Sequence, residues 1–358
     1  MAPRPGASDT IPSHTRPRVP RPPLPEIDEL PRLLEEGQPH LQARTLCEVQ
    51  AGDQCFPVQV FTLGTADPQA PAVGFFGGVH GLERIGAEVV MAYLTSLIQR
   101  LRWDRLLHQQ LEGLRMVFMP LVNPGGLWLG TRANPQGIDL MRNAPVDATE
   151  PVPWLIGGQR ISPAMPWYRG REGHAMAPEA QALTQVVQQE LLGRPFSLAL
   201  DCHSGFGSLD RIWFPYAHTR RPLEHLAQVH ALHRVFAQTH AHHRYVFEPQ
   251  SLQYLAHGDL WDHLYLQSLH APERMFLPLT LEMGSWLWVR KNPRQLFSRH
   301  GIFNPLIEHR RQRVLRRHVA LLDFMARAAC SHLNWLPSAQ HLPAEHAAAL
   351  AHWQIQTR

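Results

Sequence analysis

The sequence predicts an α/β fold in which helices cover a mostly parallel sheet. From residue 72 onward, strand-like apolar runs alternate with helical patterns, which is typical of this architecture. The runs are continuously apolar, as expected of strands that are buried on both faces. The chain has 358 residues, of which 44% are hydrophobic, so there is enough apolar material for a large core.

The expected elements follow in order. Residues 1–25 are rich in Pro and Arg and poor in core-forming residues, which predicts a flexible tail. A short helix over 26–36 and strands over 44–50 and 57–63 come next. The alternating region is expected to place strands at 72–79, 114–121, 197–201 and 275–282, and helices at 83–101, 179–192, 222–243, 259–270 and 305–329. A long loop is expected over 123–177, and residues 331–358 are expected to be peripheral.

Charge and cysteine usage restrict the class of protein. The formal net charge is only +4, and the arginines are scattered, so the sequence predicts no nucleic-acid partner. The four cysteines form no Cys-x-x-Cys pair, which favours a reducing compartment. We find no apolar signal-peptide region and no run of about 20 apolar residues, so a cytoplasmic protein without a membrane partner is expected.

Three polar motifs follow apolar runs and suggest a metal site. They contain the pair His80 and Glu83, the single His203, and the single Glu282. Two imidazoles and one carboxylate make a catalytic zinc site that leaves a fourth position for water. In parallel α/β sheets, ligands bind beyond the carboxyl ends of the strands, where all these residues are expected to lie. We therefore expect a metal-dependent hydrolase with Glu282 as its base.

Each motif also has a simpler interpretation. A His-x-x-Glu pattern is weak evidence alone, and the second copy at His270 and Glu273 is interpreted as a solvated helix end. His203 alone could be a hydrogen-bonded histidine at a strand end, and Glu282 could be a buried ion-pair partner. The combination of all the motifs at strand ends favours the metal site.

In its order of motifs the chain resembles the zinc carboxypeptidase family of the pancreatic type, as a divergent, bacterial-like member. The motifs that carry this resemblance are His80-x-x-Glu83, Asn123-Pro-Gly-Gly, Arg132, Gly137-x-Asp139-x-Met141-Arg142-Asn143, His203 and Glu282, over residues of about 55 to 325. The resemblance implies one α/β domain, over residues 26–330, with a mixed sheet.

The resemblance also implies roles for single residues. His80, Glu83 and His203 would bind one zinc ion per chain, and Asp139 would orient His80 through its second ring nitrogen. Glu282 would be the general base and then the proton donor. Arg132 would polarise the scissile carbonyl, and Arg142 would bind the terminal carboxylate of the substrate.

One position departs from the family pattern. Met141 stands where the family has an asparagine, and a thioether cannot donate a hydrogen bond to a carboxylate. The family also uses a mobile tyrosine before the catalytic glutamate. Tyr245, Tyr254 and Tyr265 are candidates, and we favour Tyr254.

These observations predict a zinc-dependent hydrolase that cleaves a C-terminal peptide bond. A zinc amidohydrolase that acts on N-acyl amino acids, like the desuccinylase and aspartoacylase group, stays an alternative. That group usually carries a small β domain after the catalytic glutamate, whereas this chain is expected to continue as helix. A non-catalytic binding protein is a third interpretation, but a mere binder has no need of Glu282. The substrate is a peptide or an acyl amino acid, and the oligomeric state is left open.

Overall fold

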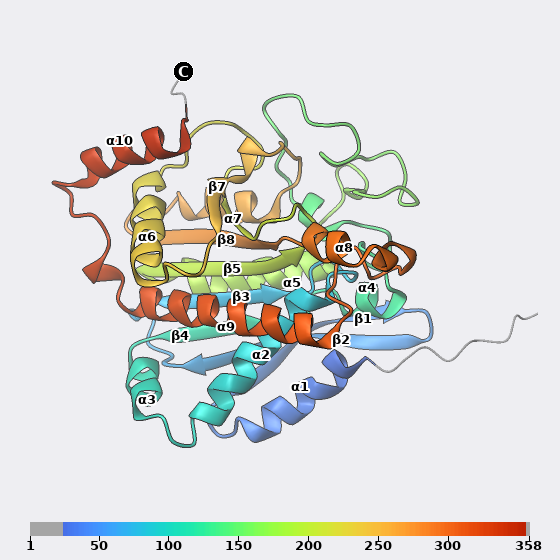
Figure 1. The fold of residues 1–358 in the computed structure, drawn as a ribbon, viewed down its shortest axis with the longest axis horizontal. Helices are drawn as coiled ribbons and strands as arrows, with labels where there is room; N and C mark the ends of the chain where they lie inside the picture. The colour runs from blue at the N-terminus through green and yellow to red at the C-terminus, as the bar shows by residue number, and fades with distance from the viewer. Residues whose placement is uncertain (1–23, 356–358) are drawn as a thin grey trace, which may run out of the picture.

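The computed structural model describes residues 24–355 and centres on one eight-stranded sheet (Figure 1). The strands are β1 (Gln42–Ala51), β2 (Gln54–Gly64), β3 (Ala72–Gly77), β4 (Arg115–Met119), β5 (Phe196–Ser204), β6 (Arg211–Phe214), β7 (Val246–Pro249) and β8 (Met275–Met283). Their order in the sheet is β1-β2-β4-β3-β5-β8-β6-β7.

The sheet is mixed and mostly parallel, as predicted. The pairs β3–β4, β3–β5, β5–β8 and β6–β7 are parallel, whereas β1–β2, β2–β4 and β6–β8 are antiparallel. The four strands at the centre, β4, β3, β5 and β8, are parallel and contain the continuously apolar runs of the sequence, and every residue of β3 and of β5 is buried. Complete burial explains why these runs show no alternation.

Helices cover both faces of the sheet. They are α1 (Pro25–Glu36), α2 (Arg84–Arg100), α3 (Arg105–Glu112), α4 (Pro124–Leu129), α5 (Pro178–Val187), α6 (Leu226–Thr239), α7 (Leu260–Ser268), α8 (Trp286–Lys291), α9 (Glu308–Cys330) and α10 (Leu342–Trp353). Helices α2 and α9 pack against β3 and β5 on one face, and α5 covers the opposite face (Figure 1). Neighbouring residues of β3 therefore belong to two separate apolar clusters, Phe75 to one and Phe76 to the other.

Three strand ends meet at one edge of this sheet. In the parallel pair β3–β5, Gly77 lies opposite Cys202, so the chain beyond β3 emerges beside His203. In the parallel pair β5–β8, His203 lies opposite Glu282. Residues in register on neighbouring strands point to the same face, so the fold brings the three sequence motifs together.

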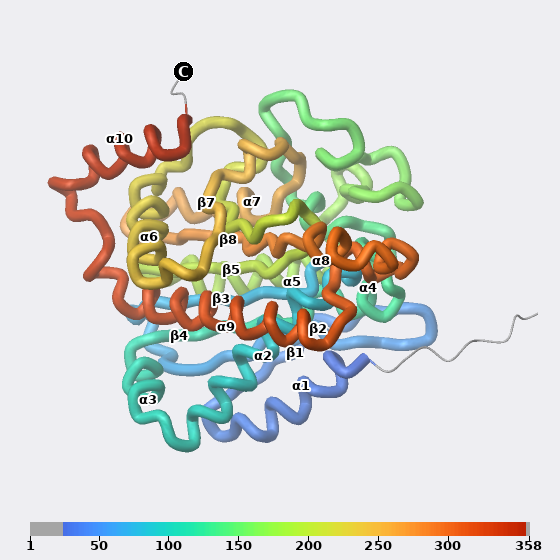
Figure 2. Tube along the Cα trace, viewed as in Figure 1, coloured from blue at the N-terminus to red at the C-terminus, as the bar shows by residue number. Residues whose placement is uncertain are grey.

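Several elements differ from the expected ones. The short strands β6 and β7 were not anticipated, and the expected loop over 123–177 contains α4 and a single 3₁₀ turn, η1 (Leu140–Arg142). The rest of that loop projects beyond the sheet (Figure 2). The expected tail over 1–25 lies almost wholly outside the described residues, and α1 already begins at Pro25. Beyond residue 330, Trp353 of α10 is buried and donates a hydrogen bond to the carbonyl of Phe247.

None of the helices between residues 24 and 355 combines the length and the apolar composition that crossing a membrane would require.

Candidate metal centre and active site

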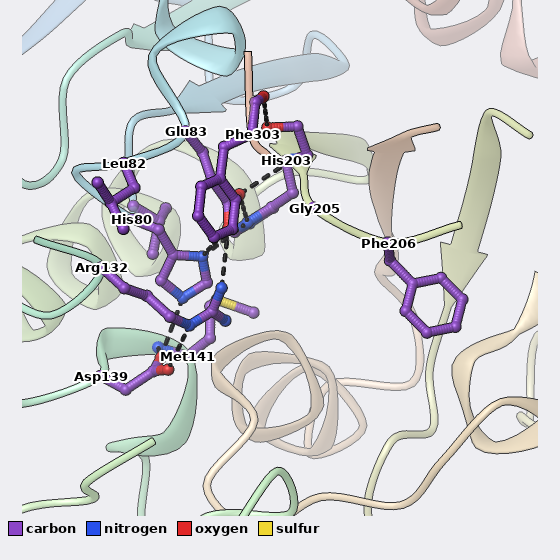
Figure 3. A network of polar contacts seen from close by, with 12 residues as sticks. His80, Leu82, Glu83, Arg132, Asp139, Met141, His203, Gly205, Phe206 and Phe303 are labelled. Atoms are coloured by element: carbon purple, nitrogen blue, oxygen red, sulfur yellow. Dashed lines mark hydrogen bonds and ion pairs between the residues drawn. The ribbon is translucent and has the colours of Figure 1, made fainter. Parts of the chain in front are cut away.

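Three buried side chains, those of His80, Glu83 and His203, converge at the sheet edge (Figure 3). The His80 Nδ1 lies 3.1 Å from Glu83 Oε1, and the His203 Nδ1 lies 3.1 Å from Glu83 Oε2. The two Nδ1 atoms are 3.2 Å apart. Among the residues that the structure describes, this is the one group of three or more such side chains with ligand atoms this close together.

Two glycines allow this convergence. Gly78 has a φ of +62°, which lets the chain turn sharply between β3 and His80. Gly86, in the first turn of α2, packs directly on β5, because a Cβ atom there would lie 2.1 Å from the carbonyl oxygen of Cys202. Helix α2 can therefore approach β5 closely, and the Glu83 carboxylate reaches His203.

The outer nitrogen of each imidazole contacts a buried carboxylate. His80 Nε2 lies 3.0 Å from Asp139 Oδ1, and His203 Nε2 lies 2.6 Å from Asp201 Oδ2. A carboxylate accepts hydrogen bonds, so each Nε2 carries the proton, and in neutral rings each Nδ1 is left with a lone pair. Two lone pairs and a carboxylate facing one another repel unless a cation lies between them, so the donor set fits a zinc ion.

The charges around the cluster favour the ionised forms of both His203 and Glu83. Burial lowers the pKa of His203, but Asp201 and Glu83 outweigh it and raise that pKa well above its usual value. Burial raises the pKa of Glu83, but the two imidazoles outweigh it and hold that pKa below its usual value. In the absence of metal, a proton on His203 would therefore balance the negative charges of Asp201 and Glu83.

Arg132 joins this network. Its Nε donates to Asp139 Oδ2 at 2.9 Å, and its Nη1 donates to Glu83 Oε1 at 2.9 Å (Figure 3). Burial raises the pKa of Asp139, but Arg132 and His80 outweigh it and hold that pKa well below its usual value. Arg132 is thus part of the cluster, forms ion pairs with both carboxylates and favours the ionised form of Asp139.

Glu282 lies beside the cluster on the neighbouring strand. Its Oε1 accepts a hydrogen bond of 3.0 Å from the backbone N–H of Phe206. Burial and the nearby Glu83 raise the pKa of Glu282 to about 8. A cation between the imidazoles would lower this pKa, because positive charge favours the carboxylate.

Arg142 is buried and held mainly by backbone groups. Its Nε donates to the carbonyl of Ile156 at 3.2 Å, and its Nη1 donates to that of Met141 at 3.0 Å. Its Nη2 makes a longer contact of 3.4 Å with the hydroxyl of Tyr254, and the guanidinium carbon lies 5.8 Å from the centre of that ring. The Met141 side chain is buried in an apolar cluster.

Of the three tyrosine candidates, Tyr254 is the one beside an expected site residue. The hydroxyl of Tyr245 contacts His318, and that of Tyr265 contacts His225.

The sequence reasoning missed Asp201. This residue is fully buried and accepts hydrogen bonds from His203 and from the indole of Trp261, at 2.9 Å. A signal was present, because residues two apart on a strand share a face, and Asp201-Cys-His203 follows an apolar run.

The fold and the buried cluster define an α/β domain with a metal-binding centre at the carboxyl edge of a mixed sheet. The chain belongs to the zinc carboxypeptidase family, whose model matches residues 46–283. This family is zinc-dependent, and the match ends earlier than the 325 expected from the resemblance.

Curated relatives match over part of their length. Carboxypeptidase E of Caenorhabditis elegans is 26% identical over 191 residues, which is 49% of this chain and 37% of that protein. Carboxypeptidase SOL1 of Arabidopsis thaliana is 31% identical over 75 residues, which is 21% of this chain and 15% of that protein. The chain thus spans well under half the length of these relatives.

Solved structures share the fold. Thrombin-activatable fibrinolysis inhibitor has a TM-score of 0.63 at 16% identity, with 84% of this chain and 72% of that chain covered. Carboxypeptidase A from Helicoverpa armigera has the same TM-score and identity, with 84% and 71% covered.

Proposed function

We propose that this protein is a zinc-dependent hydrolase that cleaves C-terminal peptide bonds. The observation that carries the proposal is the convergence of two imidazoles, one carboxylate and a second glutamate in a chain of the zinc carboxypeptidase family. His80, Glu83 and His203 would hold one zinc ion per chain. An ion bound there would polarise the scissile carbonyl and lower the pKa of a water molecule that it binds.

Glu282 would serve as the general base. Its carboxylate would take a proton from the attacking water and then pass it to the leaving amine. Burial and the nearby Glu83 raise the pKa of this carboxyl, which strengthens it as a proton acceptor, and a bound cation would lower the pKa again so that the group is ionised before the attack. The hydrogen bond from the N–H of Phe206 fixes one oxygen and leaves the other for this transfer.

Arg132 would stabilise the negative charge that develops on the carbonyl oxygen. Two of its nitrogens are bound to Glu83 and Asp139, and within residues 24–355 its Nη2 has no hydrogen-bond partner. The two bonds fix the direction of the guanidinium, so the remaining donor is preorganised. Asp139 would hold His80 in the tautomer that presents Nδ1 to the metal.

Arg142 would bind the terminal carboxylate of the substrate. Its longest contact, from Nη2 to the hydroxyl of Tyr254, is the one that a substrate carboxylate could replace. Because Met141 supplies no donor at the neighbouring position, we expect weaker selection for a free carboxylate than two donors would give.

The helical segment that follows β8 favours a peptidase over the N-acyl amino acid hydrolase. Within the described residues, β8 is followed by α8, α9 and α10 and by no strand, whereas the desuccinylase and aspartoacylase group usually carries a small β domain there. The cytoplasmic location stays a proposal that four free cysteines support.

A substrate panel tests the function. Zinc-loaded protein is incubated with peptides that differ in the C-terminal residue, with the same peptides as C-terminal amides, and with N-acyl amino acids, and products are identified by mass spectrometry. We expect release of a single amino acid from the free-acid peptides and at least about tenfold slower cleavage of the amides. Cleavage of the N-acyl amino acids alone, or of nothing at all, would reject the proposal.

A matched pair of variants tests the carboxylate contact. Arg142→Lys keeps the charge and loses the fork-shaped donor pair, so KM for free-acid peptides should rise about tenfold with less change in kcat. Arg171→Lys makes the same exchange at an exposed position in the following loop and should leave both constants unchanged.

A further inference from the structure

Two consecutive residues between α8 and α9, Phe303 and Asn304, contact both segments that carry the ligand candidates, the start of α2 and the end of β5. Asn304 is buried, and its Nδ2 donates to the carbonyl of Leu82 at 2.8 Å. Its Oδ1 accepts a hydrogen bond of 2.9 Å from the backbone N–H of Ile85. These two hydrogen bonds fix the position of the backbone on both sides of Glu83.

The contact with Ile85 supplies a hydrogen-bond acceptor that the start of α2 otherwise lacks. Glu83 is the N-cap residue of α2, but its side chain makes no capping hydrogen bond, because its carboxylate points to His80 and His203. The first N–H groups of a helix need acceptors from outside the helix. Asn304, more than 200 residues further along the chain, provides one of them. Glu83 can therefore serve the metal centre while α2 still begins with a capped N–H group.

Phe303 contacts the second segment, at the end of β5. Its carbonyl accepts a hydrogen bond of 2.7 Å from Ser204 Oγ, and the backbone N–H of Ser204 donates to Glu83 Oε2 at 3.0 Å. A Cβ atom at Gly205 would lie 3.0 Å from the Phe303 ring and 3.8 Å from Glu83 Oε1, so ring and carboxylate lie against the same residue. Figure 3 shows the Phe303 ring in front of the Glu83 carboxylate.

The two residues are themselves rigidly held. The side chain of Gln295 is almost fully buried, and its Nε2 donates to the carbonyls of Gly301 and Asn304 at 2.9 and 3.1 Å. Asn304 Nδ2 also donates to the carbonyl of His300 at 3.0 Å. This compact turn lies beyond residue 283, where the match to the family model ends.

We infer that Asn304 is a positioning residue for the metal centre, acting through the backbone on either side of Glu83. With Phe303 it forms a clamp, residues 303–304, that joins the segment 80–85 before and at the start of α2 to residues 203–205 at the end of β5. The inference rests on the proposed zinc site but not on the substrate or on hydrolysis. Residues that orient metal ligands from outside commonly contribute about 10- to 100-fold in metal affinity.

The test measures metal binding. Asn304→Ala should raise the zinc Kd, determined by competition with a chelating dye, by about 10- to 100-fold, and should alter the visible absorption bands of the Co²⁺-substituted protein. Asn304→Asp keeps an acceptor for Ile85 and should recover part of the affinity. Ser204→Ala removes the tie to Phe303 and should weaken zinc binding several-fold. Asn334→Ala, an exposed asparagine near the end of α9, is the matched control.

Each outcome supports or rejects the role of Asn304 as a positioning residue. If Asn304→Ala is folded well below its melting temperature and binds zinc within about twofold of wild type, the inference is wrong even if the variant is less stable. If that variant does not fold, Asn304→Asp and Ser204→Ala decide it by the same criterion. Wild-type protein that binds zinc but hydrolyses no substrate would reject the proposed function and leave the clamp standing. Wild-type protein that binds no zinc would overturn both.

Discussion

The buried carboxylate of Asp201 should set both the strength and the pH dependence of zinc binding. Asp201→Asn keeps the shape of the side chain, and its amide oxygen can still accept from His203 and Trp261. The substitution therefore removes the negative charge behind His203 with little change in packing. Such partners of zinc histidines contribute about 10- to 100-fold in affinity, or about 1.4 to 2.7 kcal/mol.

The size of this effect should depend on pH. Asp201 raises the pKa of His203 in the metal-free protein, so protons compete with zinc at His203. The Asp201→Asn substitution would lower that pKa and relieve the competition. Zinc binding by the variant should thus be most impaired, relative to wild type, at high pH, and the two proteins should converge as the pH falls.

The assay is a chelator competition for zinc at several pH values between about 6 and 9. Asp323→Asn is the control, because Asp323 pairs with Arg100 and Arg327 on α2 and α9 and contacts no ligand candidate. An unchanged Kd at every pH, or a ratio of the two Kd values that does not vary with pH, would refute this reasoning.

Three other substitutions give further predictions. Glu282→Gln should retain zinc, measured by metal analysis, and lose about 100- to 10,000-fold in kcat; equal turnover would remove its role as base. Gly86→Ala places a methyl group on the carbonyl of Cys202 and should lower the free energy of unfolding in urea by about 2 kcal/mol or more, whereas Gly113→Ala, which meets nothing within 4 Å, should change it by less than about 0.5. Burial lowers the pKa of His318 to about 4 from 6.5, so the unfolded chain binds its proton first and stability falls from about pH 6.5 to pH 4; His318→Gln should flatten this part of the urea-midpoint profile, and an identical slope would contradict the assignment.

The sequence indicated the centre of the fold well because β3, β4, β5 and β8 contain continuous apolar runs, as expected of strands that are covered by helices on both faces. The strands β6 and β7 have four residues each, and both are followed closely by proline or contain it. Runs so short carry no periodicity that separates a strand from a loop.

For the site, three of the candidate residues could be foreseen because each lies where a central strand ends. His80, His203 and Glu282 needed only the rule that the carboxyl ends of parallel strands share an edge. Asn304 could not be foreseen. Its partners Leu82 and Ile85 lie more than 200 residues away, and nothing in its own neighbourhood differs from an ordinary turn.

The position of β8 in the sheet affects how the polypeptide can fold while it is being synthesised. This strand is the last of the eight to leave the ribosome, yet it lies between β5 and β6. Until it arrives, β5, which is wholly buried in the finished fold, has one long edge without a neighbouring strand, and the β6–β7 pair is not joined to the sheet. Nascent chains that stall or break before residue 275 therefore expose a surface on which strands of other chains can pair, so premature termination should yield aggregates and not a smaller folded product.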